Sequence, residues 1–161
     1  MFALKGIISS PRKRPEVLRG SSPLQAAGLS NGVNRALERV GKDLTTARTI
    51  LKIDEEWAYT ISYHAMLRAG RALMLSLGYR PKGKDQHKTV VEFCSKVLGE
   101  EYRMLINKLY RMRQKRHKFV YEFDSPISKS EADQSIKNAK KLIDAIYEII
   151  KGKESGLFKG K

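Results

Sequence analysis

Cysteine is almost absent from this sequence, and long apolar runs are absent altogether. Cys94 is the single cysteine among 161 residues, so an intramolecular disulfide and a cysteine-rich metal site are both excluded. No apolar run approaches the roughly 18 to 20 residues of a membrane span. Lys5 interrupts the apolar stretch at the start, which argues against a secretory signal. We therefore expect no membrane partner and a reducing, cytoplasmic setting.

Acidic residues are scarce as well. The chain has 17 Asp and Glu against 32 Lys and Arg, which gives a formal charge of +15. Such an imbalance predicts a polyanionic partner, and RNA or DNA comes before membrane lipid. Part of the excess lies in residues 1–27 and 151–161, but the residues between them are also net positive.

Motifs for metals and cofactors are missing too. His64, His87 and His117 lie far apart without ligand spacing, so no metal site is expected. Residues 78–84 match the G-x4-G-K core of a phosphate-binding loop, but Asp85 stands where Ser or Thr should bind magnesium. The loop also follows a predicted helix and not a strand, so we interpret the match as accidental. No cofactor is expected.

Apolar residues recur at spacings of three and four, which predicts helices and no strand. The predicted helices cover residues 33–51, 57–77, 88–98, 100–123 and 130–150. This pattern predicts an all-α fold, an up-and-down antiparallel bundle of four long helices plus one short helix. Small residues in the second helix, Gly70 among them, indicate close helix packing.

Capping residues and composition set the expected boundaries. Asp54 with Glu55 and Glu56 is typical of a helix start and less so of a metal cluster, and Gly78 and Gly99 are typical of helix ends. Ser130 with Asp133 resembles a capping box for the last helix, and Asn31 a cap for the first. We expect a flexible basic arm over residues 1–30, a helical bundle over 31–151 and a basic disordered tail over 152–161.

The fourth predicted helix carries most of the functional signal. Between Arg103 and Lys118 it holds seven Lys or Arg residues and no carboxylate. At about 100° per residue, its apolar stripe runs through Leu105, Leu109, Met112, Val120 and Phe123, with Arg116 in the middle. One flank gathers Arg113, His117, Tyr110 and Tyr121, whereas Arg111, Lys115 and Lys118 point more towards solvent. Alternatively, Arg116 extends its charged group to the surface or pairs with a buried acid, and the lysines form a solvated face.

Two segments resemble a known family. Residues 62–66 (SYHAM) and 69–73 (AGRAL), in a helix ending at Gly78, are similar to the second helix of HEPN domains (higher eukaryotes and prokaryotes nucleotide-binding). Residues 112–121 (MRQKRHKFVY) resemble the motif helix of that family, in which Arg is followed by four to six residues and then His. The likeness spans roughly residues 33–150.

The resemblance implies a homodimer through the fourth helix and an RNA-binding toxin or effector with metal-independent endoribonuclease activity. Its partner would be a nucleotidyltransferase antitoxin, which in some members transfers AMP to a tyrosine near the motif; Tyr121 is the candidate here. On this basis Arg116, His117 and Tyr121 are the candidate catalytic residues. The candidate nucleic-acid-binding residues are Arg111, Arg113, Lys115 and Lys118.

The motif departs from the family at one position. Counted from Arg116, the fifth residue is Tyr121 where the family has His, and only Arg111 with His117 keeps the spacing literally. Tyrosine, with an unperturbed pKa of about 10, is a poor base near neutral pH. An alternative is therefore a non-catalytic nucleotide- or partner-binding HEPN module that works with a nucleotidyltransferase. A third hypothesis is a basic scaffold whose arm binds nucleic acid without specificity.

Overall fold

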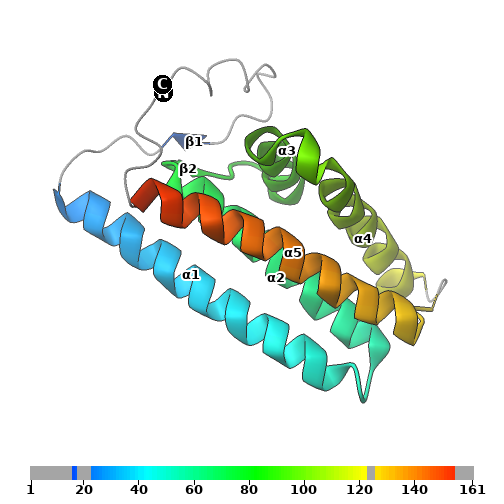
Figure 1. Cartoon of the computed structure of the whole chain (residues 1–161). Coiled ribbons are helices and arrows are strands. Elements are labelled where there is room, and N and C mark those ends of the chain that lie inside the picture. Colours follow the sequence, from blue (N-terminus) through cyan, green and yellow to red (C-terminus); the bar gives the residue numbers. More distant parts are fainter. Residues whose placement is uncertain (1–15, 18–22, 123–125, 155–161) are drawn as a thin grey trace.

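The computed structural model describes residues 16–17, 23–122 and 126–154 (Figure 1). Its helices are α1 (Pro23–Ile50), α2 (Glu55–Ser76), α3 (Gln86–Leu98), α4 (Arg103–Tyr121) and α5 (Lys129–Glu154), with a 3-10 turn, η2 (Glu100–Tyr102), before α4. The long helices α1, α2, α4 and α5 alternate in direction along the chain (Figure 1). The predicted all-α up-and-down bundle is confirmed. In the described part of the chain, no helix has both the length and the apolar character that crossing a membrane demands.

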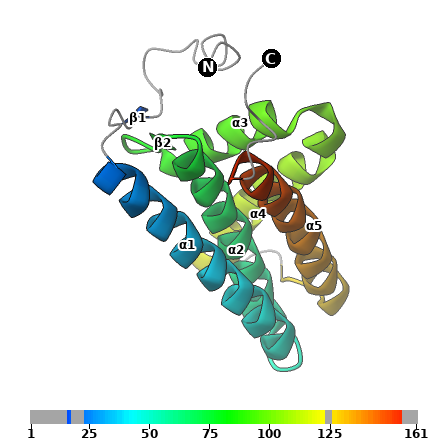
Figure 2. The same ribbon diagram turned by 60° about the vertical axis from the view of Figure 1, so that its left-hand side comes forward.

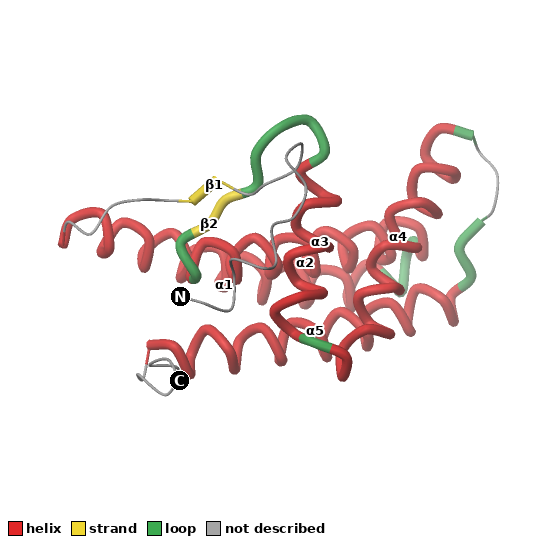
Figure 3. Tube along the Cα trace, turned by 90° about the horizontal axis from the view of Figure 1, so that it is seen from above, coloured by secondary structure: helices red, strands yellow, loops and turns green. Residues whose placement is uncertain are grey.

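Two very short strands were not predicted. β1 (Glu16–Val17) pairs antiparallel with β2 (Tyr79–Arg80), and Glu16 lies opposite Arg80 (Figure 3). Two residues are too few to show the alternation of apolar and polar side chains by which a strand is predicted. The ladder leaves the fold class unchanged.

Helix α2 is the centre of the bundle. It contacts α1, α3, α4 and α5, and thirteen of its residues are buried (Figure 2). A helix surrounded in this way needs small side chains where neighbours come close. A Cβ on Gly70 would lie 2.6 Å from Val90 Cγ1 and 2.8 Å from Cys94 Sγ, both on α3. The prediction of close helix packing is therefore confirmed at Gly70.

The ends of the middle helices follow the predicted caps. Asp54 is the N-cap of α2, since its carboxylate accepts a hydrogen bond from the Trp57 backbone N at 2.8 Å. Gly78 and Gly99 follow α2 and α3 with φ of 81° and 76°, the left-handed region that favours glycine. The acidic cluster at residues 54–56 thus starts a helix, as predicted.

The first helix begins earlier than predicted, at Pro23 and not near Val33. The sequence does not indicate this start, because Gly28, Asn31 and Gly32 contribute nothing to an apolar stripe. The early turns of α1 therefore include residues assigned to the arm, and the extent of the arm stays a prediction.

The capping box of α5 is also different from the predicted one. Ser128 Oγ accepts from the backbone N of Glu131 at 3.2 Å, and Glu131 Oε2 accepts from the backbone N of Ser128 at 3.0 Å. The prediction of Ser130 with Asp133 is wrong by two residues. Ile127 and Ala132 are buried on either side of the Ser128 box, in the positions of a hydrophobic staple, and this burial selects its register.

Candidate nucleic-acid interface

The inner face of α4 changes character along its length. Ile106, Leu109 and Met112 are buried, but one turn later the core-facing position is held by Arg116, which is half-buried. Phe119 continues this face and meets the ring of Tyr59 edge-on, with centroids 6.4 Å apart. The sequence thus places a permanently charged side chain between two apolar contacts.

Val120 does not belong to the inner face, although the periodicity predicted it there. Its side chain is 41% exposed, whereas the preceding Phe119 is half-buried. The aromatic ring of Phe119 packs against Tyr59. The inner face therefore continues from Arg116 to Phe119, three residues on, and not to Val120, four residues on. Phe123, predicted on the same stripe, lies outside the described residues.

Arg116 reaches two consecutive side chains of α2. Its Nη1 lies 3.2 Å from His64 Nε2, and its guanidinium carbon lies 5.5 Å from the centre of the Tyr63 ring. A guanidinium can only donate, so Nε2 of His64 accepts and the imidazole is neutral. Among the described residues, Arg116 is not paired with an acid: its contacts are the imidazole of His64 and the aromatic face of Tyr63.

Tyr63 connects this contact to α3. Its hydroxyl lies 2.7 Å from Nδ1 of His87, and the two rings are stacked with an interplanar angle of 21°. The side chain of Tyr63 is only 1% exposed, whereas His87 is half-buried in the first turn of α3. Arg116, Tyr63 and His87 thus form a continuous chain of contacts from α4 through α2 to α3.

Burial keeps Tyr63, His64 and His87 neutral, and positive charge adds to this effect on the two histidines. Burial, then Arg116, lowers the pKa of His64; burial, then Arg71 and Arg113, lowers the pKa of His87. Burial raises the pKa of Tyr63, although the neighbouring arginines oppose this. Desolvation disfavours the charged form of each group, and nearby cations add to that effect on the histidines. Both imidazoles are therefore unprotonated near neutral pH.

A buried carboxylate, Asp43, lies near the contact between Arg116 and His64. Asp43 of α1 is 5% exposed and pairs with Arg39 at 3.0 Å and closely with Arg68 of α2. Arg68 lowers the pKa of His64 and Asp43 raises it, so both lie within electrostatic reach of that imidazole. The ion pair of Asp43 with Arg68 ties α1 to α2, one turn along α2 from His64, the partner of Arg116.

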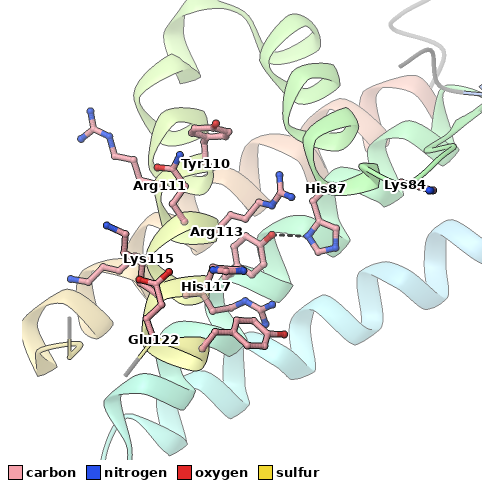
Figure 4. A pocket seen from close by; sticks show the side chains of 13 residues that line it. Lys84, His87, Tyr110, Arg111, Arg113, Lys115, His117 and Glu122 are labelled. Carbon is pink, nitrogen blue, oxygen red and sulfur yellow. Dashed lines mark hydrogen bonds between the residues drawn. The ribbon is translucent and has the colours of Figure 1, made fainter. Parts of the chain in front are cut away.

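An open hollow of about 1090 Å³ lies against α4, and we call it the α4 groove (Figure 4). Its lining comes from α2, the loop before α3, the start of α3, and α4 with the residue that follows it. The lining residues are Tyr63, Lys84, His87, Tyr110, Arg111, Arg113, Gln114, Lys115, Arg116, His117, Lys118, Tyr121 and Glu122. All seven residues predicted as catalytic or nucleic-acid-binding are among them, and their roles stay predictions.

The α4 groove is strongly cationic. Six of its lining residues are Lys or Arg, two are His and only Glu122 is acidic. Arg113 pairs with Asp85 at 3.2 Å and Lys115 pairs closely with Glu131. Within the described residues, Lys84, Arg111 and Lys118 have no carboxylate partner. An anion in the groove would therefore meet cations whose charge no neighbouring acid cancels.

His117 and Tyr121 lie at the solvent side of the groove. Their ring centroids are 4.8 Å apart, and Tyr121 is 65% exposed. Arg116 is turned inward toward α2. The three predicted catalytic residues therefore line the same groove, but Arg116 lies deeper in it than His117 and Tyr121. The two tilted rings are accessible to a nucleobase, which would stack on one of them.

Tyr63, His64, Lys84 and His87 were not predicted as site residues. Sequence spacing separates the histidines, and only the packing of α3 against α2 brings His87 to Tyr63, the residue next to His64. A usable signal was the pair Tyr63 and His64, two rings with polar atoms in a helix most of whose residues are buried. Across the described ranges, no three His, Cys, Asp or Glu residues are arranged to hold a metal ion.

The chain matches a known protein family. Curated proteins show no significant match to the chain. The model of the family described as HEPN domain matches residues 33–150, which covers α2 to α4 and most of α1 and α5. A domain of this kind supports nucleotide or RNA binding, or ribonuclease-type chemistry. The match includes every described residue of the α4 groove, and we conclude that the chain belongs to the HEPN domain family.

Proposed function

We propose that the protein binds RNA in the α4 groove. The observation that carries this proposal is the groove itself, with six Lys or Arg side chains against one carboxylate along a single helix. A polyanionic backbone gains most from cations that are not already neutralised, and Lys84, Arg111 and Lys118 supply them. His117 and Tyr121 add aromatic faces at the solvent side for unpaired bases.

The proposed activity is endoribonucleolytic cleavage without a metal ion. Cleavage of this type needs a group that takes the 2′-hydroxyl proton and cations that stabilise the phosphorane charge. The groove offers the neutral imidazole of His87 and guanidinium groups within one cluster. In the cell we propose a homodimer joined through α4 that acts as toxin or effector, controlled by a nucleotidyltransferase antitoxin.

Cleavage of tRNA or total RNA by the purified full-length protein in EDTA tests this function. We expect wild-type protein to cut, and Arg116→Ala to lose cleavage because it removes the innermost cation of the groove. His117→Ala tests whether the exposed histidine takes part. An intact RNA ladder with wild-type protein, at concentrations where RNA is bound, would refute the nuclease and leave the binding function.

A second candidate is a non-catalytic module that binds a nucleotide or a nucleotidyltransferase subunit. It is favoured by the inward engagement of Arg116 with His64 and by Tyr121 in the place of the motif histidine. Incubation with a cognate nucleotidyltransferase and ATP should then give a stable complex or an adenylylated Tyr121. Mass spectrometry of Tyr121→Phe is the matched control for the modified residue.

A further inference from the structure

The α4 groove contains a histidine that the motif helix does not supply. His87 comes from the first turn of α3, and in Figure 4 Arg113 extends from α4 in its direction. On α4 itself, the position expected for a histidine when counted from Arg116 is occupied by Tyr121. Resting on the ribonuclease function proposed above, we propose that His87, positioned by Tyr63, is the general base of RNA cleavage in this groove.

The orientation of its ring suits His87 to this role. A base must be held in a fixed pose, and the 2.7 Å contact between the Tyr63 hydroxyl and Nδ1 fixes the imidazole of His87. When Nδ1 carries the proton and donates it to the hydroxyl oxygen of Tyr63, Nε2 keeps its lone pair. Tyr63 is 1% exposed, so it acts through His87, whereas His87 itself lines the groove.

Positive charge lies close to His87. Arg116 lies over the ring of Tyr63 at 5.5 Å, and Arg113 pairs at 3.2 Å with Asp85, two residues before His87. Both arginines also act on the pKa of His87, so both lie within electrostatic reach of the imidazole. A phosphate bound by them would lie beside the base, as stabilisation of a phosphorane requires.

The protonation state supports the geometry. Desolvation, Arg71, Arg113 and Arg116 lower the pKa of His87, and Asp85 alone among its neighbours raises it. The other titratable groups that face it are Tyr63, whose pKa burial raises, and His64, whose pKa burial lowers. The imidazole is therefore neutral at pH 7 and ready to accept a proton.

The reaction follows from these positions. Nε2 of His87 takes the proton of a ribose 2′-hydroxyl, whose oxygen forms a bond to the adjacent phosphorus. The bond between phosphorus and the 5′-oxygen breaks, and that oxygen takes a proton from water. The products are a 2′,3′-cyclic phosphate and a 5′-hydroxyl, and imidazolium returns its proton to solvent. No oxidant or metal is needed for this balance.

The rival base is His117, which the sequence favoured. His117 is exposed, and the contact recorded for it is the tilted ring of Tyr121. Among the described residues, no group comparable to the Tyr63 hydroxyl fixes the ring nitrogens of His117. Variants of the two histidines therefore separate the hypotheses.

The experiment compares full-length wild type with His87→Gln, Tyr63→Phe and His117→Gln in EDTA. Single-turnover cleavage of tRNA and equilibrium tRNA binding are measured on the same samples. We expect His87→Gln to lower the cleavage rate by about 100-fold or more with unchanged binding, because general bases contribute at this level. A further variant, His87→Ala, leaves space for free imidazole. Added imidazole should restore its cleavage activity, whereas it would not restore activity if the variant had only lost a structural contact.

Tyr63→Phe keeps the ring and removes the hydroxyl, so it tests positioning. We expect the cleavage rate to fall less than in His87→Gln. We also expect the acid limb of the pH–rate profile to shift. In the wild type, the midpoint of this limb lies below the ordinary histidine pKa of about 6.5. Wild-type cleavage by His87→Gln, with loss in His117→Gln, would overturn the assignment and leave the nuclease intact. Binding without any cleavage by wild type would overturn both.

Discussion

Arg116 is the residue at which the core and the α4 groove meet. Its guanidinium donates to His64, lies over Tyr63 and still lines the groove. Leu or Met at this position would extend the apolar face of α4, as Met112 does one turn earlier. The charge is therefore retained where packing alone would favour an apolar side chain, which is typical of functional positions.

Replacement of Arg116 by Gln should raise the pKa of both His64 and His87. The positive charge of Arg116 is among the causes that lower each of these values, so its removal makes protonation easier. NMR titration of the two imidazoles measures the change. Lys118→Gln is the matched control, since Lys118 is not among the causes for either histidine. Unchanged titration curves in Arg116→Gln would contradict the contact geometry.

At the scale of single elements, the start of α5 is set by Ser128. Its hydroxyl accepts from Glu131 N at 3.2 Å, so Ser128→Ala should lower the free energy of unfolding by about 1 kcal/mol. Ser130→Ala removes the same atom two residues later, on an exposed site, and should have little effect. Urea unfolding monitored by circular dichroism measures both. Equal losses would mean that the cap lies elsewhere.

The packing of α2 on α3 depends on Gly70. Gly70→Ala would place a Cβ 2.6 Å from Val90 Cγ1, so we expect the free energy of unfolding to fall by about 1 to 3 kcal/mol. Gly41 of α1 has nothing within 4 Å of the same added atom. Gly41→Ala should therefore stabilise the protein by about 0.5 to 1 kcal/mol, because alanine loses less backbone entropy than glycine.

Thermal unfolding of Gly70→Ala and Gly41→Ala, measured side by side, tests both expected changes in stability. A stabilised Gly70→Ala would show that α3 shifts to accept the methyl group. Because α3 carries His87, such a shift should also change RNA cleavage, and the two measurements can be compared on one sample.

For the whole molecule, the distribution of charge matters more than its sum of +15. If RNA lies in the α4 groove, the double variant Arg111→Gln with Lys118→Gln should weaken binding and reduce the slope of log K against log salt by about 1.4 for single-stranded RNA. Both side chains line the groove without a carboxylate partner among the described residues. Fluorescence anisotropy at several salt concentrations gives the slope.

Lys42→Gln with Lys52→Gln removes the same charge from exposed positions at and after α1, outside the groove lining. This control should keep nearly the wild-type slope. Equal losses in both double variants would favour non-specific attraction, and no loss in either would move binding to the basic arm predicted for residues 1–30.

Much of the fold could be predicted because its information is local. Apolar spacing predicted each helix, and Asp54, Gly78 and Gly99 predicted where helices begin and end, since caps and periodicity act over a few residues. The start of α1 and the cap of α5 could not be predicted. At these places two local patterns compete, and burial of Ile127 and Ala132 decides the second.

The sequence by itself determined the helical bundle, its HEPN family, the excess of positive charge and the basic helix that lines the groove. Only the tertiary structure decided which groups meet there. Tyr63 and His87 are separated by 24 positions, and Arg116 lies 52 positions after His64. No short-range pattern links such residues, because their contact depends on how α3 and α4 pack against α2.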